Sequence, residues 1–136
     1  MVNVHDGDTL TVLVDRTQVR VRLIEIDAPE LGQPFGKRSR QALAEICAGK
    51  VARVEDHGKD RYHRTLGGVT CDGVYANAEL VRQGLAWVYV RYAPKNSPLY
   101  RLEAAARAER RGLWAEPHPV APWEWRRAGS GRASHY

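Results

Sequence analysis

Cysteine is scarce in this sequence of 136 residues, which contains only Cys47 and Cys71. Two cysteines are too few for a disulfide scaffold, and their spacing fits neither a CxxC redox pair nor a zinc ribbon. A structural zinc site is therefore not expected. The sequence leaves two alternatives for the pair: one disulfide, which would need an oxidising compartment, or two buried free thiols.

Long apolar stretches and histidine motifs are missing as well. No apolar run approaches the roughly 18 residues that a membrane-spanning helix needs, so we expect no membrane partner. The 5 histidines show no HxH or HExxH spacing, which argues against a zinc nuclease. What is present, with 43% hydrophobic and 27% charged residues, is typical of one soluble globular domain.

The charge is basic overall but unevenly distributed. The formal net charge is +5, yet residues 1–34 hold three arginines against six carboxylates, a balance of −3, whereas residues 35–136 carry +8. A basic balance suits a polyanionic partner such as nucleic acid. The acidic first quarter does not suit that partner by itself and needs a separate explanation.

The order of the predicted elements indicates an α+β protein with a mainly β core. The sequence predicts five strands: one each at 9–14, 19–23 and 50–55, and two in a hairpin that turns at Asp72-Gly73. It predicts helices over 37–48, over 78–83 and from Ser97-Pro98 to Gly112. Successive strands exclude a parallel α/β sheet and favour a small antiparallel barrel with helices outside, such as the OB-fold.

Acidic residues flank the first hairpin at both of its ends. Asp6 and Asp8 precede the strand at 9–14, and Asp27 and Glu30 follow the strand at 19–23. Because a hairpin returns both ends to one edge of a barrel, we expect the four carboxylates to converge there. Clustered carboxylates repel one another unless a cation lies among them, and an all-oxygen set favours Ca²⁺ over Zn²⁺.

Two arginines are candidates for binding a phosphate beside such a cation. Arg22 lies on the strand that leads to Asp27, and its alternation with valine and leucine predicts that it points away from the local core face. The alternation changes phase at Leu23-Ile24, which implies a bulge or a strand buried on both sides. Arg64 lies in a polar loop, and guanidinium groups bind phosphate with two parallel hydrogen bonds. Taken singly, each of these features is more often an ordinary turn or a solvated side chain.

Four blocks of sequence, taken together in order and spacing, outweigh that ordinary interpretation. They are Asp6–Thr9 (DGDT), Val21–Glu30 (VRLIEIDAPE), Asp60–Arg64 (DRYHR) and Asn77–Ala86 (NAELVRQGLA). From Val2 to about Trp114 the chain resembles the staphylococcal nuclease (thermonuclease) family. The resemblance implies a five-stranded antiparallel OB-fold barrel with three helices packed outside. It also implies a Ca²⁺-dependent phosphodiesterase that cuts DNA and RNA and leaves 3′-phosphate ends.

The resemblance further implies a role for individual residues. The implied metal ligands are Asp8, Asp27 and the carbonyl of Ala28, the catalytic groups are Arg22, Glu30 and Arg64, and the aromatics near the nucleotide are Tyr62 and Tyr92. Ala28 stands where the best-known member has threonine, which matters little if only its carbonyl binds. Glu30 would act either as a general base or as a group that positions water. His63 replaces a glycine that most members have, so it either alters the loop that aims Arg64 or is a surface variant.

Two further interpretations stay open at the level of sequence. One is a non-catalytic nucleic-acid-binding OB-fold module, which would lack some of the carboxylates or arginines. The other is a protein-interaction module with a Trp-rich tail, which predicts no salt-dependent affinity for DNA. All five carboxylates and arginines of the family pattern are present, so the enzyme is favoured.

The remaining expectations concern organisation and address. We expect a nuclease domain over residues 1–114 and a tail with Trp and Pro over 115–136, whose tryptophans pack on the body and whose last residues are disordered. We expect a monomer. The chain opens without a signal peptide, but members of the resembling family are often secreted or periplasmic, which favours an extracytoplasmic address.

Overall fold

One main sheet carries most of the strands in the computed structural model, which describes residues 2–129. Its strand order is β1 (Val2–Asp6), β2 (Thr9–Val14), β3 (Thr17–Leu23), β6 (Thr65–Cys71) and β5 (Ala52–Lys59). A two-residue strand, β7 (Val74–Tyr75), pairs with β6. A second small sheet joins β4 (Ile26–Asp27) to β8 (Trp87–Val88). The predicted α+β class with a mainly β core is confirmed.

Strand β3 lies in the middle of the main sheet, between antiparallel β2 and parallel β6. Val21, Arg22 and Leu23 are buried in succession, so the end of this strand is covered on both faces. Of the two alternatives for the change of phase at the end of this strand, two-sided burial is therefore the one observed. The parallel ladder between β3 and β6 differs from the wholly antiparallel barrel that the sequence predicted.

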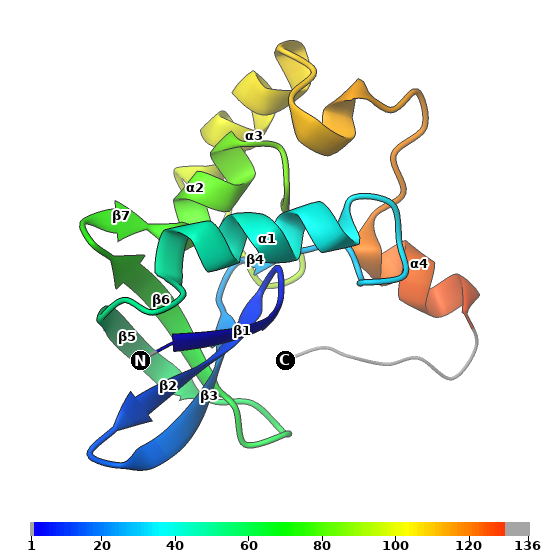
Figure 1. Ribbon diagram of the computed structural model, residues 1–136. Coiled ribbons are helices and arrows are strands. Elements are labelled where there is room, and N and C mark those ends of the chain that lie inside the picture. The colour runs from blue at the N-terminus through cyan, green and yellow to red at the C-terminus, as the bar shows by residue number, and fades with distance from the viewer. Residues whose placement is uncertain (1, 130–136) are drawn as a thin grey trace.

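Three helices occur where the sequence predicts them, with shifted ends. They are α1 (Gly36–Cys47), α2 (Ala76–Arg82) and α3 (Leu99–Ala108). The chain then forms a 3-10 turn, η1 (Gly112–Ala115), and a fourth helix, α4 (Pro122–Ala128), which the sequence did not predict. In Figure 1 the segment after α3 runs back past the N-terminal end of α1 to reach α4. No helix within residues 2–129 has the length and apolar character needed to cross a membrane.

A disulfide joins the end of α1 to the end of β6. Cys47 and Cys71 are fully buried, with their Cα atoms 5.3 Å apart, so the disulfide is the alternative that the structure supports. Closing a loop of this length is worth about 3 kcal/mol in a chain-entropy account. The bond lies in the core between the sheet and α1, where Leu10, Leu23 and Leu43 are also fully buried.

The part of the tail that the structure describes, residues 115–129, packs against the body. Its Trp123 contacts Trp87 at 5.6 Å between ring centroids and stacks on Tyr89 at 5.3 Å. The disorder expected for the last residues concerns positions 130–136, which lie outside the described residues. The tail thus adds a structured segment beside the loop that follows β4.

Candidate active site

The ends of the first hairpin meet at Asp8 and Ala28. The backbone N–H of Ala28 donates to Oδ2 of Asp8 at 2.8 Å, and the N–H of Leu23 donates to the carbonyl of Asp8 at 2.9 Å. Gly7 makes this approach sterically feasible, because a Cβ there would lie 2.7 Å from the Cβ atoms of both Ala28 and Ser39. The glycine of the DGDT block therefore has a packing reason, and the expected meeting of the two acidic segments is confirmed.

Arg22 is the buried cation at this meeting point. Its Nη2 lies 3.5 Å from Oδ2 of Asp8 and 3.2 Å from Oδ1 of Asp27, and its Nη1 donates to the carbonyls of Leu23 and Ile26. Only 2% of the residue is exposed. Its side chain bonds the two carboxylates rather than solvent, so this face of β3 is a closed polar pocket.

A third guanidinium, which the sequence did not predict, reaches Asp27 from α4. Arg126 donates from Nη2 to Oδ2 of Asp27 at 2.7 Å and from Nη1 to Oδ1 at 3.2 Å, a bidentate pair. The same Nη1 lies 3.7 Å from Oε1 of Glu30. Arg126 is 3% exposed, and its Nε is buried without a hydrogen-bond partner among the described residues.

Glu30 is held by the backbone of the loop after β4, while its carboxylate stays accessible. Its N–H donates to the side chain of Gln33, and its carbonyl accepts from the N–H of Gln33. The start of α1 packs closely against this loop, because a Cβ on Gly36 would lie 1.8 Å from the carbonyl oxygen of Glu30. The Glu30 side chain is 31% exposed, against 1% for Asp27, so water can reach the Glu30 carboxylate.

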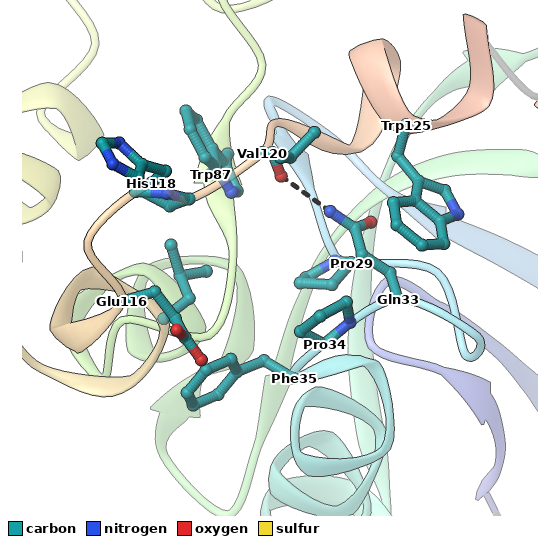
Figure 2. Close-up of a pocket in the computed structure, with 11 residues that line it drawn as sticks. Pro29, Gln33, Pro34, Phe35, Trp87, Glu116, His118, Val120 and Trp125 are labelled. Atoms are coloured by element: carbon teal, nitrogen blue, oxygen red, sulfur yellow. Dashed lines mark hydrogen bonds between the residues drawn. The ribbon is translucent and has the colours of Figure 1, made fainter. Parts of the chain in front are cut away.

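The loop after β4 and the C-terminal segment are joined next to the site. Gln33 donates from Nε2 to the carbonyl of Val120 at 2.6 Å, the bond drawn in Figure 2. The two segments enclose a largely apolar cavity of about 150 Å³, with Pro29 and Trp125 among its lining residues (Figure 2). This contact fixes α4 relative to the loop that carries Glu30.

The carboxylates of the pocket have strongly perturbed acidity. Burial, followed by the charge of Asp8, raises the pKa of Asp6 to about 8. Burial also raises the pKa of Asp27 to about 6, against the opposing effects of Arg22 and Arg126. Burial acts in the same sense on Asp8, but there Arg22 and hydrogen bonds outweigh it, so the pKa of Asp8 lies below its ordinary value.

The oxygen atoms at this site determine whether a divalent cation could bind there. Within residues 2–129, no group of three or more His, Cys, Asp or Glu side chains is arranged to hold a metal ion. The expected set is smaller, namely two carboxylates and one carbonyl, and its oxygen chemistry fits a hard cation. Asp8 and Asp27 both contact Arg22 Nη2, so the two carboxylates are close enough to share a partner. Arg126, however, occupies both carboxylate oxygens of Asp27.

Arg64 and Tyr62 belong to a separate, local arrangement in the loop after β5. Asp60 accepts from the backbone N–H groups of Tyr62 and Arg64 and, at 2.7 Å, from Nε of Arg64. Backbone hydrogen bonds from this loop and the ion pair outweigh burial, so the pKa of Asp60 is lowered. The guanidinium lies 5.4 Å from the ring centroid of Tyr62, which is 46% exposed. His63 has φ +64°, a left-handed conformation that explains why glycine suits this position.

Tyr92 connects to the site indirectly, through aromatic neighbours. Its ring contacts Tyr89 edge-on at 5.0 Å between centroids, and Tyr89 stacks on Trp123 of α4 at 5.3 Å. The structure thus groups Asp8, Ala28, Asp27 and Arg22 directly, reaches Glu30 through Arg126, and leaves Arg64 with Tyr62 on their own loop. No signal in the sequence points to Arg126, because its segment has no periodic pattern.

Comparison with known proteins gives the same family as the sequence blocks. The family described as "Staphylococcal nuclease homologue" matches residues 20–116. A protein named "Protein ParB" from Escherichia coli is 46% identical over 97% of this chain and 80% of its own length. "Micrococcal nuclease" from Shigella flexneri is 44% identical over 94% of this chain and 79% of its own. An "Uncharacterized endonuclease" from Haemophilus influenzae is 43% identical over 93% of this chain and 71% of its own length. The chain therefore belongs to the staphylococcal nuclease family.

Proposed function

We propose that this chain is a Ca²⁺-dependent phosphodiesterase that hydrolyses DNA and RNA and leaves 3′-phosphate ends. The observation that carries the proposal is the convergence of Asp8 and Asp27 on Arg22, with Glu30 beside the same edge through Arg126. The nuclease names of its relatives support the reaction class. The finer claims on metal and product come from the resemblance of the four sequence blocks.

Asp8, Asp27 and the carbonyl of Ala28 would hold the metal. These are oxygen donors only, which favours a hard cation over zinc. When bound, Ca²⁺ would supply positive charge to a non-bridging phosphate oxygen and so favour attack on phosphorus.

Glu30 is the group in this site suited to handle the attacking water. Its side chain is 31% exposed, whereas Asp27 is enclosed by two guanidinium groups. In the proposed reaction Glu30 orients or deprotonates a water for in-line attack on phosphorus. The P–O5′ bond breaks, so that the 3′-oxygen keeps the phosphate and the 5′-oxygen leaves.

The arginines are suited to the charge that develops on the phosphate. Arg22 is fixed by two carbonyls and two carboxylates, so its guanidinium needs no reorganisation during the reaction. Arg64 would reach the phosphate from the loop after β5, where the exposed ring of Tyr62 would offer a surface for a base. Tyr92, beside the basic side chain of Arg91, would line the same nucleotide.

The test is cleavage of single-stranded DNA and of RNA, side by side, in Ca²⁺ and in chelator, with analysis of the product ends. We expect cleavage in Ca²⁺, loss of cleavage in chelator, and 3′-phosphate ends. Glu30→Gln should reduce turnover by about 10² or more, because it removes the carboxylate that handles the water. Glu116→Gln, which changes an exposed carboxylate that makes no ion pair among those described, is the matched control.

Several outcomes would contradict parts of the proposal separately. Undiminished cleavage in chelator would exclude the metal, and undiminished cleavage by Glu30→Gln would exclude its role. Salt-dependent binding of DNA without any cleavage would favour the non-catalytic binding module instead.

A further inference from the structure

Arg126 makes an unusual contact for a residue outside the region that matches the family. The family match ends at residue 116, yet Arg126 contacts Asp27 across 99 positions of sequence. Both Asp27 oxygens accept from it, and its Nη1 faces Glu30 at 3.7 Å. The C-terminal helix therefore inserts a permanent positive charge among the carboxylates that are suited to a cation.

A cation and this guanidinium compete for the same carboxylate. Asp27 already has Arg22 at 3.2 Å from Oδ1, so with Arg126 it faces two positive charges in a buried pocket. A divalent ion placed on Asp27 would be repelled by both, and little solvent is present to screen the repulsion. Arg22 has other buried partners that hold it in place, namely Asp8 and two carbonyls. Arg126 bonds only side chains among the contacts described, namely those of Asp27, Glu30 and Tyr89, so it is the more readily displaced of the two.

Helix α4 has anchors that do not depend on Arg126. Trp123 stacks on Tyr89 and contacts Trp87, and Val120 accepts the hydrogen bond from Gln33 (Figure 2). The helix can therefore stay docked when the guanidinium leaves Asp27. Trp123 and Trp125 both lie just before Arg126 in sequence, so movement of this side chain would change the surroundings of two indole rings.

We propose that Arg126 is an active-site residue supplied by the C-terminal helix: it is a counter-ion of Asp27, and Ca²⁺ must displace it to bind. This inference rests on the proposed Ca²⁺ site. Its consequence is that Arg126 lowers the affinity for Ca²⁺ and so sets the ion concentration at which the site is filled. The neighbouring Arg127 is exposed and makes no ion pair among those described, so it does not share this role.

The experiment is calorimetric titration of Ca²⁺ into the full chain without nucleic acid. We expect Arg126→Gln to bind Ca²⁺ at least about tenfold more tightly than the unchanged protein, because one repelling charge and one competitor are removed. Arg126→Lys, which keeps the charge but loses the bidentate fork, should lie between the two. Arg127→Gln, the matched control, should bind within about twofold of the unchanged protein.

Tryptophan fluorescence gives a second measurement on the same samples. Ca²⁺ should change the emission of the unchanged protein and of Arg127→Gln, and should change that of Arg126→Gln much less. Circular dichroism checks that each variant is folded, and if Arg126→Gln does not fold, Arg126→Lys decides the question.

The outcomes separate the inference from the proposed function. If the unchanged protein binds Ca²⁺ and the folded Arg126 variants bind it equally or more weakly, Arg126 is not a competitor and the inference is wrong. If neither the unchanged protein nor any variant binds Ca²⁺, the proposed metal site itself is overturned. If Arg126→Gln binds Ca²⁺ and the unchanged protein does not, the inference is supported in its strongest form.

Discussion

The two sequence-predicted arginines of this site are held in opposite ways. Arg22 is 2% exposed and contacts four groups from three segments of the chain. These are the carboxylate of Asp8, the carbonyl of Leu23 at the end of β3, and the carbonyl of Ile26 and the carboxylate of Asp27 in β4. Arg64 binds Asp60, which lies four residues earlier on the same loop, and rests near the half-exposed ring of Tyr62. The position of the Arg22 guanidinium therefore depends on the whole fold, whereas that of Arg64 depends mainly on the five residues of its own loop, 60–64.

This difference separates a fixed half of the site from an adaptable half. The buried half already balances its charges internally, so the position of Arg22 is set before any substrate arrives. In the loop half, Nη2 of Arg64 is buried and has no hydrogen-bond partner among the described residues, so the loop would have to move to offer this unused donor to an incoming anion. Substitutions in the first half should affect folding and activity together, and those in the second half should affect mainly activity.

The largest expected effect is that of Arg22→Gln. Removing this cation leaves buried Asp8 without its ion pair and Asp27 with one fewer, which should lower the free energy of unfolding by about 3–5 kcal/mol. Turnover should fall by about 10² or more. Urea unfolding in chelator and cleavage assays measure the two effects, with exposed Arg20→Gln as the control on the same strand. Stability equal to that of the unchanged protein would show that the pocket does not need its cation.

Arg64→Gln should reproduce the loss of activity with a smaller loss of stability. We expect turnover to fall by about 10², because a phosphate-binding charge is lost. The free energy of unfolding should fall by about 1–2 kcal/mol, less than for Arg22→Gln, since the buried Asp60 keeps two backbone N–H donors. Arg61→Gln, which changes the exposed arginine on the other side of Tyr62, is the control. A stability loss as large as that of Arg22→Gln would remove the contrast between the two halves.

The sequence predicted the part of the site that the first hairpin brings together. A hairpin brings both of its ends to one edge, which predicts that Asp8 and Asp27 lie close together, and the hydrogen bond from Ala28 to Asp8 confirms that the two segments meet. The burial of Arg22 was not predicted, because alternation describes one strand and not the chain that covers its outer face. Alternation did predict that Arg22 leaves the face of Val21 and Leu23, and it does so into a closed polar pocket.

The contribution of α4 to the site could not be predicted from the sequence, for a physical reason. Segment 115–129 is rich in Pro and Trp, so it has no apolar period from which a helix or a buried face can be inferred. Its helix is stabilised by tertiary contacts, such as the stack of Trp123 on Tyr89, rather than by its own pattern. A contact between residues 27 and 126 is in any case not encoded by local spacing.

The acidity of the buried half gives a pH test of its charge balance. The pKa of Asp6 is raised to about 8, so the folded protein keeps a proton that the unfolded chain releases near pH 4. The stability due to this proton is complete below pH 4 and is lost as pH rises through 8. In chelator, the free energy of unfolding should therefore fall by about 1–3 kcal/mol between pH 6 and 9. Asp6→Asn should remove most of that fall, and Asp15→Asn at an exposed turn should leave it unchanged. A fall of equal size in Asp6→Asn would assign it to other groups.

The smallest expected effect concerns His63 in the adaptable half. Its φ of +64° costs a residue with a side chain about 1 kcal/mol, while glycine loses about 0.5–1 kcal/mol of chain entropy on folding. The two terms nearly cancel, so His63→Gly should change the free energy of unfolding by less than about 0.5 kcal/mol. Because Asp60 fixes Arg64 through hydrogen bonds that do not involve the imidazole, turnover should also stay within about twofold. A tenfold change in turnover would instead mean that His63 positions Arg64. The hydrogen bonds of Asp60 would then not be sufficient to hold the Arg64 side chain. Parallel urea unfolding and cleavage assays on His63→Gly and His63→Ala distinguish an effect of the backbone from one of the ring, since alanine keeps the strain and removes the imidazole.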